Sequence, residues 1–184
     1  MRKDNKKALY ESIMTSVARE VKKTLNESNI ENNMNDFIYT MLLGEFNKSI
    51  NIDRLIHNPK FLRKIAGYIV EERVKDTIRY AFPRHIEEEL PRYIDGSENW
   101  WDFELNGEKV EIKAFQKGKM LSNMYATKNQ VDHKDELTFM LVEYVIVNDN
   151  IEITGIAIVD GSELEFDSRY NRLVNKGNIQ FTRK

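Results

Sequence analysis

The stretch NWWDFELNGEKVEIKAFQ, residues 99–116, decides the fold because it predicts a β-hairpin in the middle of the chain. The first strand is expected at about 100–105 and the second at about 108–115, with Asn106 and Gly107 between them. Asn-Gly is the dipeptide most typical of a two-residue type I′ turn. A turn of this kind fixes which residues of the two strands face each other.

The resulting register gives the hairpin one apolar face and one charged face, because side chains alternate along a strand. The apolar face consists of Trp101, Phe103, Leu105, Val110, Ile112 and Ala114. On the charged face Glu104 lies opposite Lys109, which is a favourable pair, but Asp102 lies opposite Glu111. Like charges directly opposite each other destabilise a sheet, so a purely structural hairpin would tend to avoid the second pair.

A divalent cation would explain these paired carboxylates. Asp102 and Glu111 are expected about 5 Å apart, and Lys113 lies two residues further along the same face. Hard cations such as Mg²⁺ bind carboxylate oxygens and keep several waters. The lysine could hold or help deprotonate one of those waters, or neutralise charge on a phosphate. The alternative is a solvated hairpin face in an unrelated α/β domain.

A long helix is predicted before the hairpin. Asn58 is a good N-cap and Pro59 suits the first helical position. The helix is expected to run to about Ala81, because Pro83 cannot continue it. The apolar stripe of this helix is Leu62, Ile65, Ala66, Ile69, Val70, Val74 and Ile78. Glu71 and Glu72 lie on opposite shoulders of the stripe, so either could point into a cleft or into solvent.

The remaining elements complete a single α/β domain over residues 1–184, with a mixed central sheet flanked by helices. Residues 1–55 are predicted to form an N-terminal helical extension with helices over 7–27 and 34–48. The apolar stripe of the first helix is expected either to pack on the core of the chain or to form a dimer contact. The other predicted elements are an irregular acidic segment over 83–98, a polar loop with a short helix over 116–136, buried strands over 138–147 and 151–160, and a short helix with a final strand over 163–184.

Composition limits the function classes. The chain has 184 residues, no cysteine and a formal net charge of −2. The absence of cysteine excludes disulfides and thiolate metal sites, which fits a reducing compartment. We find neither an apolar run of membrane-spanning length nor a signal core, so we expect a cytoplasmic protein without membrane contact. The net charge counts mildly against nucleic-acid binding, although a local patch or a bound cation could supply attraction to phosphate.

Asp102 followed by Glu111-Ile112-Lys113 resembles the motif of the PD-(D/E)xK nuclease superfamily, which includes many type II restriction endonucleases. The stretch GYIVEERV, residues 67–74, is similar to the G-x-x-x-E pattern of that superfamily and points to Glu71, with Glu72 close behind. The resemblance covers residues from about 60 to 160. It departs at the first acidic residue, where this chain has WWD and many members have Pro-Asp.

The resemblance implies a restriction-endonuclease-like core over 56–184 and a set of site residues. Mg²⁺, for which Mn²⁺ could substitute, would be held by Asp102, Glu111 and the carbonyl of Ile112. Lys113 would position the attacking water. Either glutamate of the preceding helix, Glu71 or Glu72, would orient a second metal or a water. A polar residue expected on the following helix would be Gln130, or Gln116.

The activity implied is Mg²⁺-dependent cleavage of double-stranded DNA, in particular by a type II restriction endonuclease that acts as a homodimer on a short specific site. Expected DNA contacts after the catalytic strand are Lys117, Lys119, Asn123, Tyr125, Lys128, Asn129 and Gln130, unless that segment is simply solvated. A second candidate is the basic tail, with Arg169, Arg172, Lys176, Arg183 and Lys184. The alternatives are a structure-specific nuclease, of Holliday-junction resolvase or repair type, and a non-catalytic interaction domain with a degenerate site.

Overall fold

The chain folds as an α/β structure around a five-stranded mixed sheet with strand order β1-β2-β3-β4-β5. The computed structural model describes residues 8, 12, 16, 19–20, 59–81, 83–84, 86–89, 100–105, 107–118, 126–147, 150–175, 179 and 181. The elements are α4 (Pro59–Ala81), β1 (Ile86–Glu89), β2 (Phe103–Leu105), β3 (Glu108–Gln116), α6 (Lys128–Asp132), η1 (Lys134–Glu136), β4 (Leu137–Val147), β5 (Asn150–Asp160), η2 (Gly161–Glu163), β6 (Leu164–Asp167) and β7 (Arg172–Asn175). The coarse prediction of an α/β fold with a mixed sheet is confirmed.

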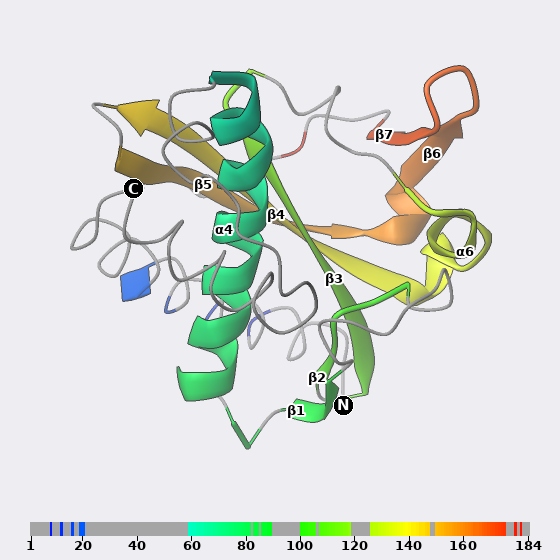
Figure 1. Ribbon diagram of the computed structural model, residues 1–184. Coiled ribbons are helices and arrows are strands. Elements are labelled where there is room, and N and C mark those ends of the chain that lie inside the picture. The colour runs from blue at the N-terminus through cyan, green and yellow to red at the C-terminus, as the bar shows by residue number, and fades with distance from the viewer. Residues whose placement is uncertain are drawn as a thin grey trace, which may run out of the picture.

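The pairing of the strands follows from how the chain connects them. The Asn-Gly turn makes β2 and β3 antiparallel, and β4 and β5 are antiparallel as well. Strands β3 and β4 are parallel, and the segment between them contains α6. A parallel pair needs a crossover of this kind to return the chain to the same end of the sheet. In Figure 1, α4 crosses in front of the sheet, while α6 and the β6–β7 pair lie together at the right.

The predicted hairpin register is confirmed up to Phe103, which pairs with Val110. Gly107 has a φ of 76°, in the left-handed region that glycine adopts without strain. Beyond Phe103 the ladder breaks, because the Asp102 N–H donates to the Val110 carbonyl at 2.8 Å. The predicted direct pairing of Asp102 with Glu111 is therefore wrong, although both carboxylates stay next to the same strand.

Apolar side chains form a core on each face of the sheet. The core under α4 contains Val70, Val74 and Ile78 from the helix, and Phe103, Val110, Ile112, Ala114, Met140 and Val142 from the sheet. The core on the other face contains Phe115, Leu137, Phe139, Leu141, Ala157, Val159, Leu164 and Leu173. Both tryptophans, Trp100 and Trp101, pack against this second core.

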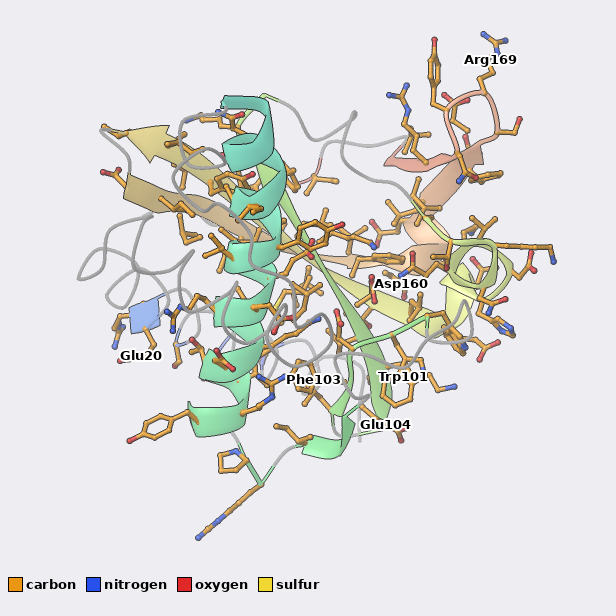
Figure 2. The ribbon with its side chains drawn as sticks, viewed as in Figure 1. Glu20, Trp101, Phe103, Glu104, Asp160 and Arg169 are labelled. Atoms are coloured by element: carbon orange, nitrogen blue, oxygen red, sulfur yellow. The ribbon has the colours of Figure 1, made fainter. Side chains whose placement is uncertain are left out.

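The position of Trp101 corrects the prediction that it shares a face with Phe103. Figure 2 shows Phe103 on the side of α4 and Trp101 on the side of α6. The break in the ladder at Asp102 interrupts the strict alternation of faces that the prediction assumed. Nearby, the Trp100 ring stacks on His133 with 4.5 Å between centroids, and Lys109 Nζ lies 4.4 Å from the centroid of Trp100.

Helix α4 has the predicted bounds, ending at Ala81. The predicted cap, Asn58, lies outside the described residues. The stripe residues from Ile65 onward are buried against the sheet, and Pro83 follows the helix as expected. Within the described ranges, no helix is long and apolar enough to cross a membrane.

Two local predictions are wrong. The acidic segment expected to be irregular over 83–98 contains β1, which pairs with β2 because Ile86 packs against the core. A short, charged strand is typical of a sheet edge. The short helix expected after 163 is instead the hairpin β6–β7. Its turn is fixed by Asp167, whose carboxylate accepts from the Arg169 N–H at 3.1 Å, and by Asn171, whose φ is 49°.

The N-terminal predictions fall largely outside the described residues. Ala8, Ser12, Ser16, Arg19 and Glu20 are helical, as expected for the predicted helix over 7–27. The predicted helix over 34–48 and the dimer contact assigned to this extension lie outside the described residues.

Candidate active site

The outer edge of β3, which faces away from β4, carries two carboxylates from other parts of the chain. Strand β2 pairs with β3 through residues 108–110. Further along the same edge, the Ile112 N–H donates to Asp102 Oδ2 at 2.8 Å, and the Ala114 N–H donates to Glu71 Oε1 at 3.0 Å. Carboxylate oxygens thus accept the hydrogen bonds that the carbonyls of a neighbouring strand would otherwise accept. Their positions are fixed by the backbone of β3.

Lys75 holds the second oxygen of Asp102. Its Nζ lies 2.7 Å from Asp102 Oδ1 and 3.3 Å from Glu72 Oε1. Burial alone would lower the pKa of Lys75, but the neighbouring carboxylates, Asp102 foremost, raise it above its usual value. Lys75 was not among the predicted site residues. Its spacing of four residues from Glu71 on one helix was the available signal, because such residues lie on one face.

Glu111 and Lys113 form the other half of the cluster, together with Gln130 of α6. Lys113 Nζ lies 2.7 Å from Glu111 Oε1 and donates to Gln130 Oε1 at 3.4 Å. Gln130 Nε2 donates to Glu111 Oε1 at 2.6 Å. Glu111 is 7% exposed and Gln130 is 4% exposed, so both are removed from bulk solvent.

The capping of α6 explains how Gln130 reaches this position. Thr127 is the N-cap, and its side chain accepts from the Gln130 N–H at 3.2 Å. In return Gln130 Oε1 accepts from the Thr127 N–H at 3.0 Å, which completes a capping box. The same side-chain amide therefore fixes the start of α6 with its oxygen and contacts Glu111 with its nitrogen.

Burial and repulsion from neighbouring carboxylates raise the pKa values of Glu71 and Glu111. Burial raises the pKa of Glu71 to about 7, against the lowering effect of Lys113 and of the Ala114 N–H. Burial also raises the pKa of Glu111 to about 7, although Lys113 lowers it, and Asp102 adds to the rise. Burial lowers the pKa of Lys113, but the carboxylates more than compensate and the net direction is upward. Such displaced pKa values are typical of functional sites.

The structure brings together most of the predicted site residues. Asp102, Glu111, Lys113 and Glu71 interact electrostatically with one another. The carbonyl of Ile112 points to the outer edge of β3, because the N–H and C=O of a strand residue face the same side. Of the two helix glutamates, Glu71 contacts β3, whereas Glu72 pairs with Lys75.

The predicted DNA contacts are only partly placed. Lys117 is exposed just after β3, and Lys128 and Asn129 lie in the first turn of α6. Lys128 is exposed and pairs with Asp132 at 2.8 Å. The predicted residues Lys119, Asn123 and Tyr125 lie outside the described residues. Gln130 is buried and contacts Glu111, so it lies among the cluster residues, on the following helix where a polar residue was expected.

Two arginines of the basic tail lie in or next to the turn of the β6–β7 hairpin. Arg169 is exposed, and Figure 2 shows it at the tip of the hairpin, far from α4. The Arg172 guanidinium lies 4.3 Å from the ring centroid of Tyr170 and 3.6 Å from Asp167 Oδ2. The tail residues Lys176, Arg183 and Lys184 lie outside the described residues.

The donor set of the cluster fits a hard divalent cation. As placed, no three His, Cys, Asp or Glu side chains of the described residues converge to hold a metal ion. The carboxylate oxygens that a cation would use form ion pairs with lysines instead: Asp102 pairs with Lys75, and Glu111 pairs with Lys113. Carboxylate and carbonyl oxygens are the ligands that Mg²⁺ prefers. With Glu71 and Glu72 included and all groups ionised, four carboxylates and two ammonium groups leave two negative charges, which matches one divalent cation.

Neither the models of known protein families nor the curated proteins match this chain. Fold and site together define an α/β protein with a largely buried carboxylate–lysine cluster along the half of β3 that does not pair with β2. The function must be inferred from that cluster.

Proposed function

We propose that this protein is a Mg²⁺-dependent DNA endonuclease with a restriction-endonuclease-like core. The observation that carries the proposal is the anchoring of Asp102 and Glu71 on the N–H groups of Ile112 and Ala114, beside Glu111 and Lys113. Carboxylates from three segments meet a lysine at one strand edge. Burying acidic side chains in this way is costly unless a cation or a proton compensates them.

Each residue of the cluster has a role in hydrolysis of a phosphodiester. Asp102, Glu111 and the carbonyl of Ile112 would hold Mg²⁺, and Mn²⁺ could replace it. When bound, the cation would lower the pKa of a water and stabilise negative charge on the phosphate. Lys113 Nζ orients the attacking water, and the carboxylate of Glu71 accepts a proton from it, which a pKa of about 7 permits. Gln130 keeps Glu111 and Lys113 in place.

The substrate we propose is duplex DNA with a short specific site, cut by a homodimer in the manner of a type II restriction endonuclease. A two-fold symmetric enzyme matches a two-fold symmetric site. Lys117 after β3, and Lys128 and Asn129 in the first turn of α6, would supply phosphate or base contacts. Because the cluster is acidic and the chain carries a net charge of −2, DNA should bind more tightly once Mg²⁺ or Ca²⁺ is present.

Incubation with plasmid and phage DNA in millimolar Mg²⁺ tests the proposal. Wild type is compared with Lys113→Ala and with the matched control Lys109→Ala, a lysine of the same strand that lies in the β2-paired half. Discrete bands from wild type and Lys109→Ala, and none from Lys113→Ala, would establish a sequence-specific endonuclease. Equal cleavage by Lys113→Ala would contradict the assignment of Lys113.

Other outcomes separate the alternatives. A smear that depends on Lys113 would indicate a nuclease without sequence choice. Intact linear duplex but cleaved branched DNA would indicate a structure-specific nuclease with the same catalytic residues. Intact DNA in every case, with no binding of Mg²⁺, Mn²⁺ or Ca²⁺, would indicate a non-catalytic interaction domain.

A further inference from the structure

Lys75 occupies the position from which a cation would approach Asp102. Asp102 Oδ2 is fixed by the Ile112 N–H at 2.8 Å, so Oδ1 is the oxygen left for a cation. Lys75 Nζ lies 2.7 Å from that oxygen. The side chains of Lys75 and Asp102 are 17% and 18% exposed, so solvent weakens this ion pair less than it weakens a pair on the surface.

Lys75 also has a second acceptor within reach. Its Nζ lies 3.3 Å from Glu72 Oε1, three residues earlier on the same helix. Helix α4 is packed on the sheet through Val70 and Val74, both fully buried. The lysine side chain can therefore pass from Asp102 to Glu72 while the helix stays in place.

We infer that Lys75 is an internal counter-cation that bridges Asp102 and Glu72 before the divalent cation binds, and that it then gives up Asp102 and stays with Glu72 alone. This inference rests on the proposed function, since it assumes that Asp102 is a metal ligand. A divalent cation at Asp102 would lie close to the ammonium group of Lys75, and like charges at that separation repel strongly in a partly buried site. Release from Asp102 and transfer to Glu72 alone weaken the repulsion and leave Lys75 paired.

Lys75 is thus a positioning residue rather than a catalytic one. It orients the Asp102 carboxylate through the same contact that competes with the metal. Lys113 also pairs with an expected metal ligand, Glu111, but it is held by Gln130 as well and is assigned to the attacking water. Removing Lys75 should accordingly strengthen metal binding, whereas removing an ordinary supporting residue should weaken it.

This inference can be tested without an activity assay. Binding of Mn²⁺ and Ca²⁺ to the full chain is measured by titration calorimetry, and binding of Mn²⁺ also by electron paramagnetic resonance. Lys75→Met removes the charge and keeps an unbranched apolar stem. We expect Mn²⁺ to bind about tenfold more tightly, the equivalent of losing one competing partly buried pair. The matched control is Arg79→Met, one turn further along α4, whose arginine pairs with Asp76. It should change Mn²⁺ affinity by no more than about twofold.

Glu72→Gln tests the second acceptor. Alone it should weaken Mn²⁺ binding, because Lys75 loses the group to which it moves. In the Lys75→Met background the same change should have a clearly smaller effect, since there is no lysine to transfer. Equal effects in the two backgrounds would contradict the transfer, because independent residues contribute additively.

The outcomes distinguish this inference from the proposed function. Asp102→Asn should abolish Mn²⁺ binding. If it does while Lys75→Met binds Mn²⁺ no more tightly than wild type, the metal site stands and the inference is wrong. Binding by Lys75→Met but not by wild type would support the inference strongly. Absence of binding in both would overturn the inference and the metal site together. Lys75→Gln replaces Lys75→Met if the latter does not fold.

Discussion

The two halves of β3 differ in what binds to the edge of the strand that faces away from β4. In the first half, residues 108–110 pair with β2, and Glu104 faces Lys109 across a regular ladder. In the second half, the N–H groups of Ile112 and Ala114 bind the carboxylates of Asp102 and Glu71. The first half therefore carries an ordinary pair of opposite charges, whereas the second half holds several carboxylates close together with little exposure to solvent.

The difference shows where the hairpin departs from what stability alone would favour. Opposite charges across a ladder stabilise a sheet modestly, and like charges destabilise it. Burial raises the pKa values of Glu71 and Glu111 to about 7, which means that their ionised forms are disfavoured in the folded chain. Departures of this kind are expected at functional sites rather than in supporting structure.

The largest expected effect is the loss of cleavage in Asp102→Asn. Asparagine still offers an oxygen to the Ile112 N–H, so the fold should persist, but it lacks the charge that a metal ligand requires. We expect Mg²⁺-dependent cleavage of plasmid DNA to fall about a thousandfold or more. Initial rates measured beside thermal unfolding curves check this. Cleavage within tenfold of wild type would show that Asp102 is not a metal ligand.

Lys113→Ala should separate rate from binding. Lys113 is expected to orient the attacking water, so its removal should lower the cleavage rate by about 10²- to 10⁴-fold. DNA affinity measured in Ca²⁺ should change much less, because Lys113 is a partly buried partner of Glu111 and not an exposed surface lysine. A large loss of affinity with an unchanged rate at saturating DNA would assign Lys113 to DNA binding instead.

The carboxyl groups beside the second half of β3 should make the free energy of unfolding fall as pH rises. The carboxyl groups of Glu71 and Glu111 have an ordinary pKa of 4.5 and a pKa of about 7 in the folded chain. Between these values the folded chain binds protons that the unfolded chain has released, so the free energy of unfolding decreases with increasing pH and levels off above about 7. One fully shifted carboxyl contributes about 3 kcal/mol.

Urea unfolding without metal over that pH range measures the effect. Glu111→Gln should remove its share of the slope, while Glu104→Gln in the regular half should leave the slope unchanged. A profile of wild type that is flat, or that rises with pH, would contradict the burial of these carboxyl groups. Saturating Mg²⁺ should stabilise the chain most at the high end of the range, since metal binding displaces the protons.

Gln130→Ala should have the smallest of these effects. It removes one arm of the capping box of α6 and the hydrogen bond to Glu111, which together should cost about 1 to 2 kcal/mol of unfolding free energy. The control Lys128→Ala removes an exposed ion pair on the same helix and should cost about 0.5 kcal/mol or less. Equal costs would show that Gln130 does not link α6 to the cluster.

Local signals in the sequence were sufficient to predict the elements that hold the site. The proline positions gave the bounds of α4, and the Asn-Gly turn gave the pairing of Phe103 with Val110. The break at Asp102 could not be foreseen, because it depends on where the carboxylate finds a backbone N–H. The strand β1 and the hairpin β6–β7 were missed because their charged residues lie on edges, where alternation is a weak guide.

The same limit applies to the site. Spacing and the family resemblance placed Asp102, Glu111 and Lys113 together and pointed to Glu71 or Glu72, and of these two glutamates Glu71 is the one that contacts β3. The four-residue spacing puts Lys75 on the same side of α4 as Glu71, but its contact with Asp102 depends on how α4 is rotated against the sheet. Tertiary packing decides that rotation, and it is not encoded in any single motif.

The most direct test compares one glutamate from each half of the hairpin. Glu111→Gln and Glu104→Gln each remove one carboxylate charge from the hairpin, and cleavage of supercoiled plasmid is followed over a Mg²⁺ titration. We expect Glu104→Gln to cleave like wild type and Glu111→Gln to show no Mg²⁺-dependent cleavage. Equal activity of the two variants would contradict the assignment of a nuclease site to the second half of β3.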